Sequence, residues 1–514
     1  MQNILSEIFS ASAKRSVEIM DKLIAFFLVL SIALPAYIFI VYLIFDAFYW
    51  KANALYVCVA ALLILGIIRI FISKEKPDVK QIYSIMPVIV YMTAVVISTL
   101  LSPYAGKAIW GQMFFHEGML TLLCYGAVFI AARLFIKNET RLNIVIYSTW
   151  ITAIIIIIDS IMRYDIRSHL NFFEIAFYAL IFILFKYLAE KEGKYSKAFK
   201  YIWISALVLF FDAALRSCIT NRDVAFYIND GATFCHRNYL ASYFTLIFLP
   251  AVASYFFSEK KKTNLLFYIL SCIFFSMFIL NHTRSAWVGN AAGFVLLIIL
   301  GRKKITLKKL SALLISFIII VFAVNTYSQG LIFTRFNTMV NDAAKLTDKD
   351  SDKTYVGTTR FKIWELSVPL IPKYFWFGAG PDMFERIFPQ KEFTKSVSAE
   401  YRGIAANAHN EYLNLILNIG IFGLLAYVWL ILSILKNYLG FYRKYGVDKK
   451  NLYLMLGLFC AWCAYLVQAF FNNSVVSTSP TLWAVMGILS AAPHYKEFVQ
   501  ASNNYLSERG EGND

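Results

Sequence analysis

Long, uninterrupted apolar stretches recur along the chain and are separated by short polar segments. A stretch of about 20 apolar residues crosses the roughly 30 Å hydrocarbon core of a bilayer as an α-helix. Because these stretches are continuously apolar rather than alternating, they fit helices and not the strands of a β-barrel. The pattern therefore predicts an all-α polytopic membrane protein with about 14 transmembrane helices. The predicted spans are 23–48, 53–73, 82–101, 117–137, 143–162, 171–189, 199–215, 238–258, 264–281, 285–300, 309–326, 410–435, 452–471 and 478–493.

Lysine and arginine divide unequally between the two sides of these spans. With the N-terminus placed inside, the inner segments hold 29 of these residues and the short outer loops hold eight. Such an excess marks cytoplasmic loops. We therefore expect residues 1–22 and 494–514 to be cytoplasmic, with the first eleven spans in 23–326 and the last three in 410–493. The long loop between spans 11 and 12, residues 327–409, then faces outward from the cell (inner) membrane.

Composition changes this picture little. Hydrophobic residues make up 59% of the 514 residues, more than a soluble domain of this size could cover. The net charge of +17 would suggest nucleic acid for a soluble protein, but here the loop bases that orient the helices explain it. The lipid bilayer, and no nucleic acid, is the expected environment.

The outer loop has three parts. Residues 341–355 are polar and are expected to be solvated. Residues 360–371 have apolar side chains at helical spacing, which predicts an amphipathic helix along the membrane surface. A Gly/Pro turn follows at 377–384. The acids of the loop are expected to be solvated surface groups: Asp342, Asp348, Asp350, Asp352, Asp382 and Glu385.

Candidate chemistry gathers at the predicted outer ends of three spans. Arg284 lies in a very short turn, where a fixed cation usually has an anionic partner, although it could also snorkel to the outer head groups. Arg237 allows the same two interpretations, and His409 alone could be a structural group. Together they match transfer from a polyprenyl diphosphate, since arginine offers the leaving diphosphate a bidentate cation. Histidine has the pKa range needed to activate an attacking hydroxyl.

Four ordered motifs in residues 230–433 add to this interpretation. They are His236-Arg237-Asn238, Thr283-Arg284-Ser285-Ala286-Trp287, Thr359-Arg360 with Trp364 and the turn 377–381, and His409-Asn410-Glu411-Tyr412 followed by Gly420-Ile421-Phe422-Gly423. In these motifs the chain resembles the O-antigen ligase and Wzy polymerase superfamily of bacterial envelope proteins. The first seven spans resemble it only in hydropathy.

The resemblance implies a GT-C type, metal-independent, inverting glycosyltransferase that uses no cofactor. It would move a glycan from undecaprenyl diphosphate to an acceptor hydroxyl at the outer face of the cytoplasmic membrane. By position, Arg237 and Arg284 would hold the diphosphate, and His409 would activate or orient the acceptor. Second-tier candidates, for which packing or a solvated charge is an equal or better explanation, are Asn410, Glu411, Arg360, Trp287 and Arg402.

Several alternatives stay open. A ligase hands the glycan to a glycolipid, such as the lipopolysaccharide core, or to a protein, whereas a Wzy-type polymerase hands it to another lipid-linked glycan. The His409 motif and the glycine turn favour the ligase. A lipid-linked oligosaccharide flippase would place charges along a central path, whereas here the distinctive residues collect on one face. A non-catalytic assembly scaffold is a further alternative.

Cysteine and histidine spacing points to no metal site. The seven cysteines show no ligand pattern, and only Cys218 and Cys235 share an outer loop, where a disulfide is one option. The spacing of the other outer histidines fits no ligand pattern either: His116, His169, His236 and His282.

Overall fold

Helices account for all regular secondary structure in the part of the chain that the computed structural model describes. That part comprises residues 2–37, 47–73, 79–136, 139–165, 234, 236–348, 350–398, 403–446 and 452–494. The longer helices are α1 (Gln2–Tyr37), α2 (Ala47–Ser73), α3 (Val79–Leu101), α5 (Met119–Phe135), α6 (Glu139–Asp165), α10 (Arg237–Phe257), α11 (Lys261–Leu280), α12 (Arg284–Gly301), α13 (Leu307–Tyr327), α14 (Leu331–Thr347), α19 (Glu411–Tyr445), α20 (Leu452–Gln468) and α21 (Ser479–Ala491). The short helices are α4 (Ala105–Trp110), α15 (Arg360–Ser367), η3 (Val368–Leu370), α16 (Ile371–Tyr374), α17 (Phe384–Ile387), α18 (Gln390–Ser396) and η5 (Ala492–His494).

Among the described residues, eight helices are long and apolar enough to cross a membrane, and α5, α20 and α21 are shorter apolar helices. The predicted spans other than 171–189 and 199–215 each overlap one of these helices or, for 23–48, the end of α1. The predicted spans 171–189 and 199–215, and the pair Cys218 and Cys235, lie outside the described residues. The chain is therefore a polytopic membrane protein, as the apolar pattern predicts.

The centre of the bundle is formed by α10, α20 and α21. Small residues let α20 approach both α12 and α10 closely. Gly289 and Gly293 of α12 face α20, where a methyl group on Gly289 would lie 2.5 Å from the carbonyl oxygen of Ala464. Gly457 of α20 makes the same kind of close approach to α10. Glycines four residues apart are a common means of helix packing in membranes, because they bring the backbones together.

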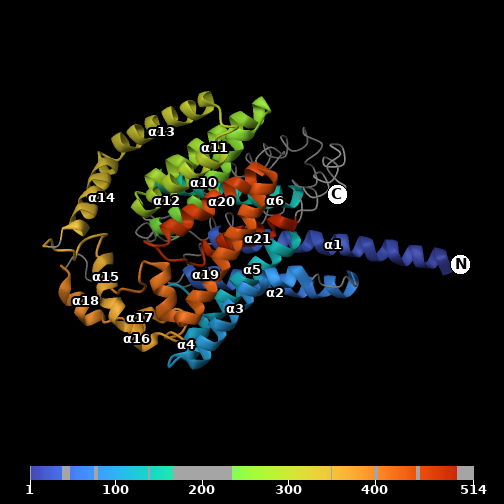
Figure 1. Ribbon diagram of the computed structural model, residues 1–514, viewed down its shortest axis with the longest axis horizontal. Helices are drawn as coiled ribbons and strands as arrows, with labels where there is room; N and C mark the ends of the chain where they lie inside the picture. Colours follow the sequence, from blue (N-terminus) through green and yellow to red (C-terminus); the bar gives the residue numbers. More distant parts are fainter. Residues whose placement is uncertain are drawn as a thin grey trace, which may run out of the picture.

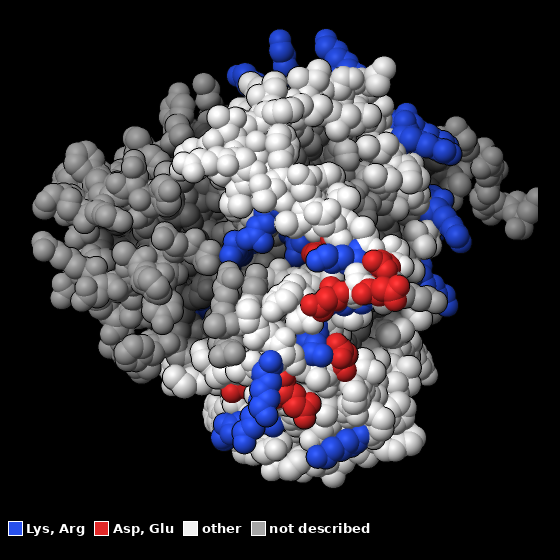
Figure 2. Space-filling model, turned by 90° about the vertical axis from the view of Figure 1, so that its left-hand side faces the viewer, with Lys and Arg blue, Asp and Glu red and all other residues white. Residues whose placement is uncertain are grey.

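The outer helices leave apolar surface uncovered. Only 17% of the residues in the most apolar 18-residue stretch of α13 are buried, whereas 94% are buried in the corresponding stretch of α10. Figure 1 shows α13 and α14 following one another around the outside of the bundle, and α15 to α18 lying below them. Figure 2 shows this face, with an uncharged region above a lower area where acids and bases mix. The exposed side of α13 carries Ile315, Ile318, Ile319 and Phe322, as expected of a helix that faces lipid.

The helix α19 is interrupted at Gly420, whose φ of 77° and ψ of −175° are not helical. The glycine turn before α17 fills the interruption. The N–H groups of Ala379 and Gly380 donate to the carbonyls of Leu417 and Asn418 at 2.8 and 2.9 Å. Membrane helices tolerate a break only where other groups satisfy the freed backbone. We call residues 375–380 and 417–421 together the loop–helix joint.

Gly378→Ala is expected to disrupt the loop–helix joint and to lower the free energy of unfolding by roughly 3 kcal/mol or more. A methyl group there would lie 2.3 Å from the backbone oxygen of Asn418, and the φ of 72° strains any residue with a side chain. Gly403→Ala is the matched control, since its methyl group would meet nothing within 4 Å. Thermal unfolding of both variants in detergent checks this; equal midpoints would show that the joint tolerates a side chain.

The helix predicted at 360–371 is present as three consecutive helical elements, α15, η3 and α16, with Pro369 in the middle one. The buried Ile363 of α15 packs in a small loop core instead of facing away from the protein. The other buried members of this core are Phe384, Phe388, Phe393, Val397, Ala405, Ala408 and Leu417. Part of the apolar spacing at 360–371 thus belongs to a protein core, whereas Val368 is 53% exposed.

Candidate active site

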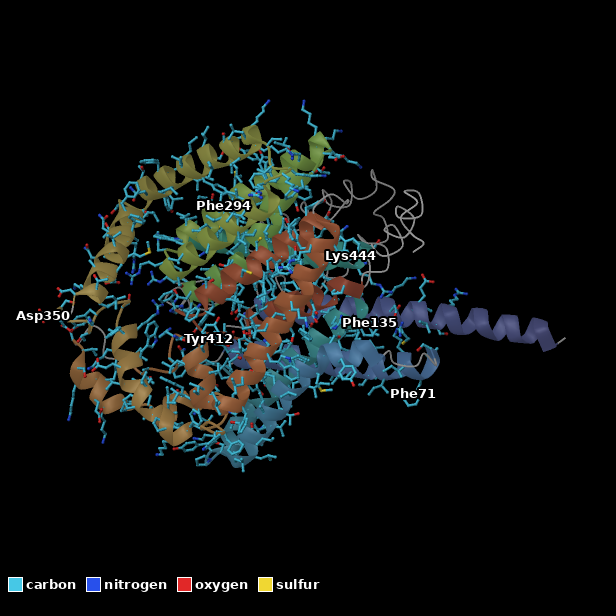
Figure 3. The ribbon with its side chains drawn as sticks, viewed as in Figure 1. Phe71, Phe135, Phe294, Asp350, Tyr412 and Lys444 are labelled. Atoms are coloured by element: carbon cyan, nitrogen blue, oxygen red, sulfur yellow. The ribbon has the colours of Figure 1, made fainter. Side chains whose placement is uncertain are left out.

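Three helices begin at the same end of the bundle, beside the loop. Arg237 starts α10, Arg284 starts α12 and Glu411 starts α19. The Thr283 hydroxyl donates to the Asn238 side chain at 3.3 Å, which ties the first two starts together. Figure 3 places Tyr412, in the first turn of α19, near the middle of the molecule. Helix N-termini carry partial positive charge, so this end of the bundle, which we call the loop end, favours anions.

The Arg284 guanidinium is held by side chains from two other elements. Its Nη1 contacts Asp342 Oδ2 of α14 at 2.6 Å and the Thr338 hydroxyl at 3.5 Å. Its Nη2 donates to the Thr358 hydroxyl at 3.1 Å. The side chain is only 14% exposed. A guanidinium reaching for lipid head groups would instead be expected to extend outward.

Arg360 and His409 lie next to this cation. Burial, followed by the positive charge of Arg284, lowers the pKa of Arg360 to about 10. Burial lowers the pKa of His409 to about 3, and the charges of Arg360 and His236 contribute further. Contacts agree with these charge effects: Arg360 Nη1 donates to the carbonyl of Gly357 at 3.3 Å, beside Thr358, whose hydroxyl accepts from Arg284 at 3.1 Å. The structure therefore brings Arg284, Arg360 and His409 into one cationic neighbourhood.

Arg237 belongs to the edge of this neighbourhood. It follows His236, whose charge acts on His409. Burial lowers the pKa of His282, and the positive charges of Arg237 and of Arg335 on α14 lower it further. The arginines at the starts of α10 and α12 thus flank the same turn, with His409 nearby.

The backbone around His409 is fixed from both sides. The Trp364 indole of α15 donates to the carbonyl of Ala408 at 2.8 Å, and the His409 N–H donates to Asn407 Oδ1 at 2.9 Å. His409 has a φ of 47°, in the left-handed region. No hydrogen-bond partner reaches its buried Nδ1 from the described residues. At neutral pH the imidazole is uncharged and has a ring nitrogen able to accept a proton.

The second-tier candidates divide by role. Arg360 lies in the cationic neighbourhood. Trp287 donates to the carbonyl of Phe278 at 3.4 Å and packs against the bundle core. Asn410 caps α19 by accepting from the N–H groups of residues 412 and 413. Glu411 accepts from the N–H of residue 474 at 2.6 Å. Arg402 lies outside the described residues.

A cavity of about 50 Å³ lies between α3, α5, α19 and α21, with room for a few water molecules. Glu117, Asp382 and Glu411 contribute to its lining. Burial raises the pKa of Glu117 well above its ordinary value and that of Asp382 to about 7. Asp382 Oδ2 accepts from the N–H groups of Gln112 at 2.6 Å and Glu117 at 3.3 Å. Asp382 is therefore not the solvated surface acid that the loop composition predicts, because it anchors the loop to the start of α5.

Asp382→Asn is expected to reduce the pH dependence of stability. The folded-state pKa is raised above the unfolded value of about 4, so stability from this group falls as pH rises from about 4 to about 7. The slope is at most about 1.4 kcal/mol per pH unit. Asparagine keeps an acceptor oxygen and does not titrate. Thermal unfolding from about pH 4.5 to 8, with exposed Asp348→Asn as the control, measures this. Identical pH profiles for wild type and Asp382→Asn would exclude Asp382 as the source.

Asp342 is a second loop acid that the sequence predicts to be solvated and that the structure places in a contact. The segment around Asp342 continues α14, and the carboxylate pairs with Arg284. A signal was present in the sequence. Arg335, Thr338 and Asp342 are spaced i, i+3, i+7, so a helix would bring them to one face.

Comparison with known proteins finds similarity over part of the chain. Residues 269–428 match the family described as O-antigen ligase, within the region 230–433 that carries the resemblance. The match includes Arg284, Arg360 and His409 but not Arg237. An uncharacterized protein of Haemophilus influenzae is 27% identical over 188 residues, 36% of this chain and 46% of that protein, so the similarity spans less than half of the relative's length. The chain is thus a polytopic membrane protein whose residues 269–428 match the family described as O-antigen ligase.

Proposed function

We propose that the protein transfers a glycan from undecaprenyl diphosphate to an acceptor hydroxyl at the outer face of the cytoplasmic membrane, as an O-antigen ligase. The observation that carries the proposal is the meeting of Arg284, Arg360 and His409 at one end of the helix bundle. The family match supports the general class of activity.

The cations suit the leaving group. When the acceptor oxygen attacks the anomeric carbon, the bond from that carbon to the diphosphate breaks, and the diphosphate takes the electron pair. Arg284 and Arg360 both contact the turn at 357–358, so together they would neutralise a charge that is spread over two phosphates. Arg237, at the start of α10, would add a third cation beside them.

His409 suits the attacking group. Its imidazole is uncharged in the donor-free chain, because its pKa is lowered to about 3, and its Nδ1 meets no partner among the described residues. A base with such a low pKa is weak. A bound diphosphate would offset the positive charges around it and raise the pKa, so the base would strengthen when the donor is present.

Product length tests the proposal. The purified full-length protein is incubated with an undecaprenyl diphosphate glycan and with acceptor glycolipids, and the products are separated by electrophoresis. A ligase caps one acceptor with one glycan. A ladder of glycan lengths without an added acceptor would identify a polymerase instead, and neither product with any donor would reject glycan transfer.

A further inference from the structure

One carboxylate oxygen at the loop end is bound as an anion would be. Asp342 Oδ2 accepts from Arg284 Nη1 at 2.6 Å and from the backbone N–H of Gly357 at 3.1 Å. The Thr358 hydroxyl contacts the other guanidinium nitrogen of Arg284 at 3.1 Å. An arginine fork, a glycine N–H and a threonine hydroxyl are the kinds of donor that proteins use for phosphate.

The turn that supplies two of these donors is strained. Gly357, Thr358 and Thr359 have φ values of 64°, 59° and 68°, in the left-handed region. β-Branched residues rarely adopt that region. Strain of this kind persists where the surroundings over-determine it, and it concentrates at ligand clamps. Here the contacts with Asp342 and Arg284 fix the first two residues of the turn.

We propose that Asp342 is an intramolecular stand-in for the lipid diphosphate. Its carboxylate occupies the anion position formed by Arg284 and Gly357, beside Thr358. It leaves that position when the diphosphate binds and returns as undecaprenyl diphosphate departs. This inference rests on the proposed function and adds Gly357 and Thr358 to the diphosphate site.

The position of Asp342 on α14 allows such an exchange. Arg335, Thr338 and Asp342 share one face of the helix, and Asp342 and Thr338 on that face contact Arg284. The opposite face carries Phe333, Phe336 and Val340, which are 42 to 51% exposed. The main neighbours of α14 among the described elements are α13 and α12. A helix packed in this way can shift without unpacking the bundle, and Figure 1 shows it at the periphery.

The stand-in has a measurable consequence for affinity. When a site is open in only a fraction of the molecules, the apparent Kd of the ligand equals its intrinsic Kd divided by that fraction. If that fraction is about one tenth, removing the competing charge tightens binding about tenfold. The same change slows release of the diphosphate product, so kcat falls together with KM.

The test compares Asp342→Asn with Asp348→Asn in the full-length protein in nanodiscs. Both variants lose one negative charge, but Asp348 is exposed and its side chain accepts from the N–H of Asp350. The expected result is that undecaprenyl diphosphate binds about five- to twentyfold more tightly to Asp342→Asn and within about twofold of wild type to Asp348→Asn. Equal affinities, or weaker binding to Asp342→Asn, would overturn the inference.

Hydrogen exchange of the wild-type protein gives a second test, which needs no variant. Undecaprenyl diphosphate should make hydrogen exchange faster in peptides from α14, because the helix loses its contacts with Arg284 and Gly357. Unchanged or slower exchange in those peptides contradicts the stand-in role.

Failure of the inference can be separated from failure of the proposed function. If the wild type binds the lipid, inorganic pyrophosphate competes and Arg284→Gln loses binding, the diphosphate site stands. An Asp342→Asn affinity equal to that of Asp348→Asn then rejects only the stand-in. If the wild type binds no undecaprenyl diphosphate, both proposals fail together.

Discussion

His409→Ala is expected to reduce glycan transfer by about a hundredfold to ten-thousandfold while the amount of protein in the membrane stays normal. The variant removes a buried imidazole whose Nδ1 meets no partner among the described residues and whose pKa the charge of Arg360 helps to lower. The rate of transfer from an undecaprenyl diphosphate glycan, measured with purified protein, gives the size of the effect. Wild-type activity in this variant would remove the base assignment.

The backbone at His409 calls for a second variant. Its φ of 47° is unfavourable for alanine, whereas asparagine tolerates the left-handed region. His409→Asn should therefore keep the local conformation and still lack transfer. His116→Asn is the matched control, since His116 has a φ of 52° and its ring packs against Tyr49. If His116→Asn were also inactive, the loss of transfer in His409→Asn could come from replacing any histidine in a left-handed conformation, and it would not identify His409 as the base.

Arg284→Lys should lower kcat/KM by about a hundredfold or more, although the charge is conserved. An ammonium cannot present the two nitrogens with which Arg284 contacts Asp342 and Thr358 together. It also lacks the planar fork that binds a diphosphate through two parallel hydrogen bonds. The same transfer assay measures the loss.

Arg302→Lys supplies the comparison for Arg284→Lys. Arg302 follows the other end of α12 and is exposed, so the same chemical change there should leave transfer intact. If Arg284→Lys transferred glycan as well as wild type, the guanidinium of Arg284 would only reach toward lipid head groups.

Most of the fold could be predicted because a bilayer imposes a simple rule on sequence. A continuous apolar run of the right length forms a helix, and α10 and α13 begin and end within a few residues of the predicted spans. The interruption of α19 could not be predicted in the same way. Gly420 lies in an apolar run, and the carbonyls freed by the break accept from a turn some 40 residues earlier in the chain and from the Ser98 hydroxyl of α3.

The site could be predicted in part. Arg284 and His409 could be predicted as candidates because a charged or titratable group at the end of a span usually has a partner or a function. In the structure the charge of Arg284 acts on Arg360, and the charge of Arg360 acts on His409. Their roles in transfer stay predictions. Asp342 and Asp382 were missed because a polar loop hides which of its acids turn inward. Burial and pairing depend on contacts between distant segments, such as Asp382 with the N–H of Gln112.

The loop–helix joint restricts how this protein can be recombined with its relatives. Leu417 of α19 belongs to the loop core, and the backbone of α19 is completed by the turn at Ala379 and Gly380. A chimaera whose exchanged loop lacks this turn would leave the carbonyl of Leu417 without its donor. The loop should therefore be exchanged as one cassette that runs from the end of α13 through the first three turns of α19.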